Sequence, residues 1–156
     1  MDKLTIKEQS TNNETWKHIH YVHKYLHKLQ IEIGKRALEH DHSKLVQPEV
    51  SVFTIYTPKL ASTTYGSEKY QAFLTEMKPA LEHHYKNNRH HPEYFKNGVD
   101  DMNLIDILEM LCDWLAATSR QNNGDIMKSI DINAKRFGLS PQLTSILKNT
   151  ITPLLN

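Results

Sequence analysis

Cysteine is almost missing from this sequence: Cys112 is the single one among 156 residues. One cysteine cannot form an intramolecular disulfide, so a disulfide-stapled fold is excluded and a reducing compartment is expected. No apolar run approaches the roughly 20 residues of a membrane-spanning helix. Residues 1–13 are polar and lack the apolar core of a signal peptide. We therefore expect a cytoplasmic protein without membrane contact.

An excess of charge of one sign is also missing, because 19 basic and 18 acidic residues leave a formal net charge of +1. Such a balance gives no electrostatic footprint for DNA, RNA or a membrane surface. A small phosphorylated ligand is not excluded, since it needs only a local cluster of cations. The length suits one domain with its own core, which we expect to cover residues 1–156, with a flexible or loosely packed segment at residues 1–13.

Alternating strand patterns of useful length are absent as well, and the sequence predicts an all-α domain, a bundle of six or seven helices. Apolar residues recur at steps of three and four from Trp16 to Ile33, which predicts an amphipathic helix over 15–33 that Gly34 ends. A short helical stretch is expected at 35–40. The other expected helices are 49–56, a long helix from Glu68 kinked at Pro79, 103–119, 125–137, and one from Ser140–Pro141 to before Pro153.

Histidine, in contrast, is abundant: the sequence has ten, all between His18 and His91. Histidine is the commonest metal ligand, and carboxylates are its usual companions around zinc, iron or manganese. The adjacent pair His40–Asp41 lies between histidines upstream and histidines and acids downstream. This distribution over several elements indicates a metal site.

Helical geometry sorts the other histidines. On the first helix His18 and His23 flank the apolar stripe, so either of them can lean inward. His84 continues the apolar stripe of Phe73, Met77 and Leu81 on its own helix, the long one expected from Glu68, so it is a candidate ligand. A core histidine bonded to a backbone carbonyl would show the same pattern. Periodicity cannot choose between His90 and His91, which lie in irregular sequence.

The helix expected at 103–119 carries an acidic line of Asp106, Glu109 and Asp113 opposite its main apolar stripe. Met110, Trp114 and two alanines make much of that side apolar too. Acids with so little other polar surface around them are candidates for a buried site, although a solvated face is the simpler alternative.

The order His18, His40–Asp41, Asp113 resembles the H…HD…D motif of the HD superfamily of metal-dependent phosphohydrolases. Val22 follows His18 as in the H-x-x-x-V start of that superfamily, and the segment from His40 to Lys44 is similar to its HD-x-G-K form. The stretches HHYKNNRHHPEYF and DMNLIDILEMLCDWLAAT look like a small phage and bacterial branch. The resemblance implies an HD-like fold and four ligands of a first metal: His18, His40, Asp41 and Asp113. His84, with His90 or His91, can hold a second metal ion.

The expected reaction is hydrolysis of a nucleotide or a related small phosphoester by a metal-activated water, with one or two ions of Fe, Mn, Zn, Ni or Co. Lys44 and Arg89 are the candidate cations for a substrate phosphate, and Asn88 and, more weakly, Tyr85 are candidate substrate contacts. Glu109 can act as a general base or as an anchor behind the ligands. The alternatives are a di-iron oxygenase-type protein and a protein that sequesters a nucleotide without turnover. A homo-oligomer is also possible.

Overall fold

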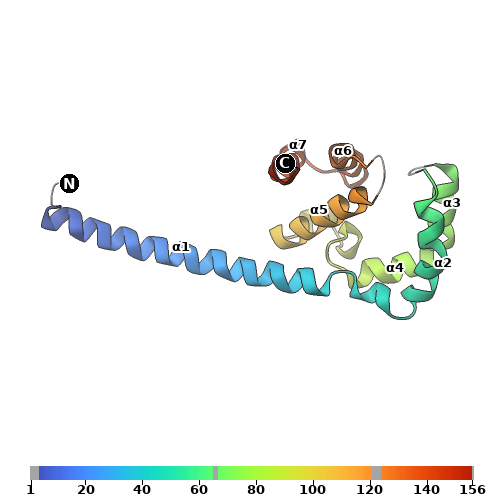
Figure 1. Ribbon diagram of the computed structural model, residues 1–156, viewed down its shortest axis with the longest axis horizontal. Coiled ribbons are helices and arrows are strands. Elements are labelled where there is room, and N and C mark those ends of the chain that lie inside the picture. Colours follow the sequence, from blue (N-terminus) through green and yellow to red (C-terminus); the bar gives the residue numbers. More distant parts are fainter. Residues whose placement is uncertain (1–3, 65–66, 121–123, 156) are drawn as a thin grey trace. The chain divides into compact units, whose positions relative to one another are not determined.

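The structure is a computed structural model that describes residues 4–64, 67–120 and 124–155. These residues form seven α-helices and no strand, which confirms the all-α prediction (Figure 1). They divide into two compact units, residues 1–38 and residues 39–156. No described helix combines the length and the apolarity that a membrane span requires.

The first unit is made of helix α1, Ile6–Glu39, which is longer at both ends than predicted. Thr5 and Glu8 begin it as a capping box, because each side chain accepts a hydrogen bond from the other's backbone N–H. The expected stop at Gly34 is wrong: the good helix formers that follow carry the helix on, and an interior glycine costs only about 1 kcal/mol. Residues 6–13 are thus helical, and the prediction of a flexible or loosely packed segment at residues 1–13 stays a prediction.

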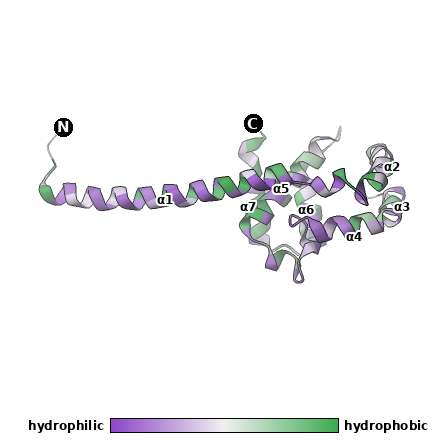
Figure 2. Cartoon of the chain, turned by 90° about the horizontal axis from the view of Figure 1, so that it is seen from below, coloured by the Kyte–Doolittle hydropathy of each residue, from purple (hydrophilic) through white to green (hydrophobic). Residues whose placement is uncertain are grey.

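Polar and apolar residues interleave along α1 (Figure 2). A lone helix has no core of its own, and α1 contains no buried residue. The two units are compact by themselves, and the prediction of one domain over residues 1–156 stays a prediction.

The second unit begins with the 3₁₀ turn η1, His42–Leu45, and helix α2, Glu49–Ala61. α2 runs five residues beyond its predicted end and includes Pro58. Pro58 lies three residues before the end of α2, so the hydrogen bond that it cannot form to the carbonyl of residue 54 and the strain of its ring fall in the last turn of the helix.

Two helices replace the single long helix expected after Glu68. α3 covers Glu68–Glu76, and α4 covers Lys78–Asn87. Pro79 explains the break, since its ring clashes with the carbonyl four residues earlier and it is well tolerated in the first turn of a new helix. α2 packs on η1, α3 and α4.

Two short 3₁₀ turns, η2 (Pro92–Tyr94) and η3 (Gly98–Asp101), lead to the last three long helices, which match their predictions. These are α5, Leu104–Ser119, α6, Ile126–Phe137, and α7, Pro141–Ile151, followed by η4, Thr152–Leu154. Asn103, Asp125 and Ser140 cap their N-termini, and Gly138 ends α6 at φ 66°. The buried core lies among these helices and consists of Met110, Leu111, Trp114, Ile126, Ile130, Leu147 and Ile151.

Candidate metal centre

His40 and Asp41 occupy the turn between α1 and η1. Asp41 has a left-handed backbone with φ 59° and ψ 14°, a conformation that aspartate tolerates better than most residues. The one-turn helix that follows returns Lys44 to the same place, and its Nζ donates to Asp41 Oδ2 at 2.6 Å. The predicted phosphate-binding cation therefore lies directly beside the predicted metal ligand.

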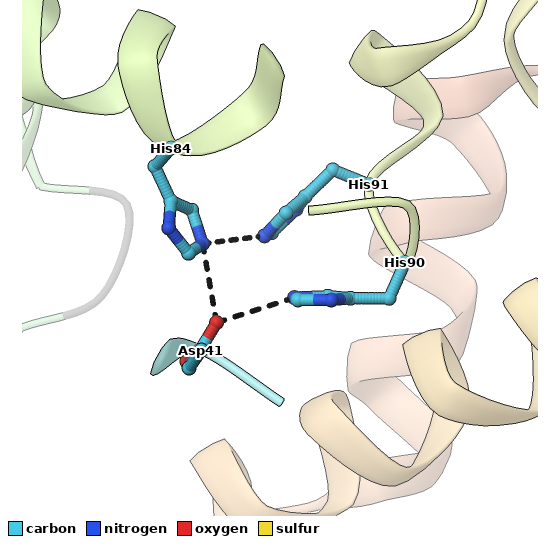
Figure 3. A group of neighbouring side chains, drawn as sticks. All are labelled: Asp41, His84, His90 and His91. Carbon is cyan, nitrogen blue, oxygen red and sulfur yellow. Dashed lines mark hydrogen bonds and ion pairs between the residues drawn. The ribbon is translucent and has the colours of Figure 1, made fainter. Parts of the chain in front are cut away.

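Three histidines converge on the other oxygen of Asp41 (Figure 3). His84 Nε2 lies 3.3 Å and His90 Nε2 lies 3.5 Å from Asp41 Oδ1. His91 completes the group, with its Nε2 at 2.9 Å from His84 Nε2. His84 lies near the end of α4, and His90 and His91 lie in the segment that follows it. The sequence could not choose between His90 and His91 as candidate ligands, and in the structure both belong to this group.

A second group adjoins the first and consists of His40, His90 and Asp113. His40 Nε2 lies 3.7 Å from Asp113 Oδ1 on α5, and the rings of His40 and His90 have centroids 4.4 Å apart. In each group the potential ligand atoms all lie within 4.8 Å of one another. Five of the six predicted metal ligands are thus brought together: His40, Asp41, His84, His91 and Asp113.

The spacing suits metal coordination. Two ligand atoms about 2.1 Å from one ion in a tetrahedral arrangement lie about 3.4 Å apart, and the Asp41–His84 and Asp41–His90 separations are 3.3 and 3.5 Å. Asp41 Oδ1 and His90 Nε2 are buried and have no hydrogen-bond partner among the described residues. Leaving such a group unpaired costs about 1–3 kcal/mol. A cation between them satisfies both, and the imidazole and carboxylate donors fit zinc, iron or manganese.

Glu109 lies behind two of the histidines. Its Oε1 is 2.9 Å from His40 Nδ1 and 3.1 Å from His90 Nδ1. A carboxylate only accepts, so both rings carry a proton on Nδ1, and Nε2 is the nitrogen that each ring directs to the centre. This geometry favours the anchor among the two roles predicted for Glu109.

The electrostatics separate the histidines. Hydrogen bonds to Asp113 and Glu109 raise the pKa of His40 to about 10. Burial and the neighbouring His90 and His84 lower the pKa of His91 to about 2. Burial and the charge of Lys44 also lower the pKa of His84. His84 and His91 are therefore neutral at pH 7. Asp113 and Glu109 keep His40 protonated in the metal-free protein, and a metal ion bound there would replace the proton on its Nε2.

Burial by itself would raise the pKa of Asp113, but a hydrogen bond from His40 and the charges of His90 and Lys44 outweigh it, and the pKa falls below its usual value. Asp113 is therefore a carboxylate at neutral pH, the form that binds a metal ion.

Two predicted substrate contacts have structural partners instead. Arg89 donates to both oxygens of the fully buried Asp106 at 3.1 and 2.9 Å. Asp106 also forms the capping box of α5, so the acidic line predicted on this helix divides, and only Glu109 and Asp113 face the histidines. Asn88 is buried against His84. These contacts do not exclude a substrate role for Arg89 and Asn88, which stays a prediction.

His18 lies on α1, in the first unit. Both ligand groups lie in the second unit, so a metal-binding role for His18 or His23 also stays a prediction.

A cavity of about 280 Å³ in the second unit shares His91 and Asp113 with the ligand groups. Tyr85, Trp114 and Phe137 supply aromatic wall, and α6 supplies Lys128 and Arg136. A larger cavity of about 400 Å³, between η2 and the start of α7, contains none of the ligand residues in its lining. Of these two cavities, the smaller one is therefore the one that adjoins the ligand groups.

Sequence reasoning missed Glu49, a fully buried carboxylate at the start of α2 that contacts His84 Nδ1 at 2.9 Å. A signal was present, since Glu49 continues the helical stripe of Phe53, Tyr56 and Leu60 and so was placed to face inward.

Comparison with known proteins gives one result. The sequence model of DUF5662, described as a family of unknown function, matches residues 7–153. Neither the curated proteins nor the solved structures contain a significant match to the chain.

Proposed function

The chain belongs to the DUF5662 family, and we propose that it is a metal-dependent phosphohydrolase of the HD type that acts on a nucleotide or a similar small phosphoester. The observation that carries the proposal is the convergence of four histidines and two aspartates around two buried, unpaired ligand atoms. A ligand set of this kind without cysteine suits hydrolytic metal sites of zinc, iron or manganese.

A bound divalent ion lowers the pKa of a coordinated water and polarises a phosphoryl oxygen. The protein's own residues supply the rest. Asp41, Asp113 and the histidine Nε2 atoms hold the ion, and Glu109 keeps two of those histidines in the ligand tautomer. Lys44, about one-third exposed beside Asp41, is placed to bind a phosphoryl oxygen and to stabilise the charge that develops on it.

The adjoining cavity supports a nucleotide as the substrate. Trp114 and Phe137 have parallel rings, with centroids 6.3 Å apart and an angle of 4° between their planes, and Tyr85 lies near His91. Tyr85 and Phe137 are partly exposed and offer flat aromatic surface of the kind that stacks with a nucleobase, whereas Trp114 is buried and packs behind Phe137. A volume of about 280 Å³ limits the ligand to one small molecule, such as a nucleoside monophosphate.

The test has two steps. Metal content is measured by mass spectrometry on protein purified without chelator, and phosphate release is then measured on nucleoside mono-, di- and triphosphates and p-nitrophenyl phosphate with each of Mn, Fe, Co, Ni and Zn. Asp113→Asn is expected to lose at least 100-fold in activity. The matched control is Asp131→Asn, which changes an exposed acid paired with Lys148 and should keep activity.

Three results would contradict the proposal. Absence of metal from the protein, with no binding when metal is added back, removes the centre. Tight nucleotide binding without phosphate release indicates the sequestering alternative. Oxygen consumption by an iron-loaded protein that releases no phosphate indicates the oxygenase alternative.

A further inference from the structure

Glu49 is a charged side chain with no exposure, yet it belongs to neither group of potential metal ligands. Its two oxygens bind two adjacent histidines of α4. Oε2 lies 2.9 Å from His84 Nδ1, and Oε1 lies 2.7 Å from His83 Nδ1. His83 is 39% exposed, so the carboxylate connects a surface histidine with a histidine of the centre.

The hydrogen bonds around His84 decide which of its nitrogens carries the proton. Asn88 Nδ2 also approaches His84 Nδ1, at 3.0 Å, and would compete if its protons were directed there. Its two amide protons have other acceptors, however: Ser43 Oγ at 2.7 Å and the His84 carbonyl oxygen at 2.8 Å.

Ser43 Oγ lies 3.1 Å from Glu49 Oε2 and 3.2 Å from His84 Nδ1. The carboxylate can only accept, so a hydroxyl proton directed at Glu49 agrees with a proton on His84 Nδ1, whereas one directed at Nδ1 would leave two acceptors facing each other at 2.9 Å. Asn88 thus donates to Ser43, and Ser43 donates to Glu49. The proton between Glu49 and His84 therefore belongs to Nδ1. His84 Nε2, which lies 3.3 Å from Asp41 Oδ1 and 2.9 Å from His91 Nε2, then carries a lone pair. In the metal-free protein this lone pair accepts the hydrogen bond from His91, and a metal ion would take the place of that proton.

We propose that Glu49 is a second positioning residue of the metal centre, beside Glu109: it holds His84 in the Nδ1–H tautomer and fixes its ring so that Nε2 is presented as a metal ligand. This inference rests on the proposed metal site and adds a residue from α2, an element that contributes no ligand to either group. His83 supports the arrangement, because its bond to Oε1 keeps the carboxylate plane fixed.

Free histidine has no such restriction on its tautomer, so loss of Glu49 costs affinity even though every ligand remains. Outer-shell partners of this kind typically contribute about 10–100-fold in metal affinity. We expect zinc affinity to fall within that range in Glu49→Leu. A fall near the lower end, about tenfold, is expected in Glu49→Gln, which keeps a neutral acceptor for Nδ1–H.

The experiment measures two quantities. Zinc affinity is obtained by competition with a chromophoric chelator, with no phosphoester present. The tautomer of His84 is obtained from long-range proton–nitrogen NMR spectra of metal-free protein. Asp106→Asn is the control, because it alters an equally buried carboxylate that pairs with Arg89 and is expected to lower stability while zinc affinity and the His84 tautomer stay unchanged.

The expected result is an Nδ1–H tautomer in the wild type and in Glu49→Gln, and its loss in Glu49→Leu together with the fall in affinity. An Nε2–H tautomer in the wild type overturns the inference, and so does a Glu49→Gln or Glu49→Leu affinity within twofold of wild type. If Glu49→Leu fails to fold, Glu49→Gln decides. Failure of phosphate release alone contradicts the proposed function and leaves both readouts intact.

Discussion

Asp41 allows the metal-binding argument to be tested with little disturbance of the fold. In Asp41→Asn the side chain keeps its size, and asparagine tolerates the left-handed backbone at φ 59°. The carboxylate that faces His84 and His90 on one oxygen and Lys44 on the other is lost. A residue that binds the metal itself should contribute at least as much as its outer partners, so we expect zinc affinity to fall by about 100-fold or more, which is about 2.8 kcal/mol.

The metal-free protein should respond much less. The Asp41 and Lys44 side chains are 21% and 32% exposed, and a solvent-screened pair of this kind contributes about 1 kcal/mol or less. Asp41→Ala adds a backbone term of up to about 1–2 kcal/mol, because alanine lacks the short polar side chain whose local hydrogen bonds let aspartate and asparagine tolerate the left-handed region. The difference in unfolding free energy between the alanine and asparagine variants therefore reports the cost of the left-handed backbone at residue 41. Both variants lack the carboxylate, so both should lose zinc affinity to a similar extent.

Zinc affinity is measured by chelator competition, and unfolding free energy by urea titration with EDTA present. His42→Ala is the matched control, since it changes an exposed neighbour that belongs to neither ligand group. Wild-type zinc affinity in Asp41→Asn would refute the assignment of Asp41 as a ligand. Equal stability of the alanine and asparagine variants would refute the backbone argument.

Three further outcomes follow from single residues. The raised pKa of His40 stabilises the metal-free protein fully below pH 6.5, and this contribution is lost as the pH rises through about 10. The unfolding free energy from urea titration should therefore decline between these pH values, and less steeply in His40→Gln. Equal pH slopes of the unfolding free energy in the wild type and His40→Gln would contradict the prediction. Arg89→Ala leaves the buried carboxylate of Asp106 without its cation and should lower the unfolding free energy by about 2–3 kcal/mol with unchanged zinc affinity, whereas a loss of affinity would place Arg89 at the centre. A β-carbon at Gly34 meets no atom within 4 Å, so Gly34→Ala should stabilise α1 by up to about 1 kcal/mol, measured as helicity by circular dichroism during thermal unfolding; a decrease would indicate that the helix stops there after all.

Local chemistry made the helices of the C-terminal half predictable. Caps at Asn103, Asp125 and Ser140 act within one turn, and Gly138 acts through its own backbone, so short windows of sequence contain the necessary information. The predicted helix boundaries were wrong where a single glycine or proline was weighed against the helix-forming residues on either side of it. Gly34 did not end α1, and Pro79 separated two helices rather than bending one.

The sequence by itself also determined most of the ligand types. The pair His40–Asp41, the inward face of His84 and the position of Asp113 on α5 are consequences of residue order and helical period, and these side chains do meet. The placement of both His90 and His91 beside Asp41 was decided only by the tertiary structure, because an irregular segment has no period from which to read a direction. The same holds for Asp106, which pairs with Arg89, and for Glu49, which lies behind His84. Each of these contacts joins residues at least 17 positions apart, and such partners are chosen by how the helices pack rather than by any neighbouring residue in the chain.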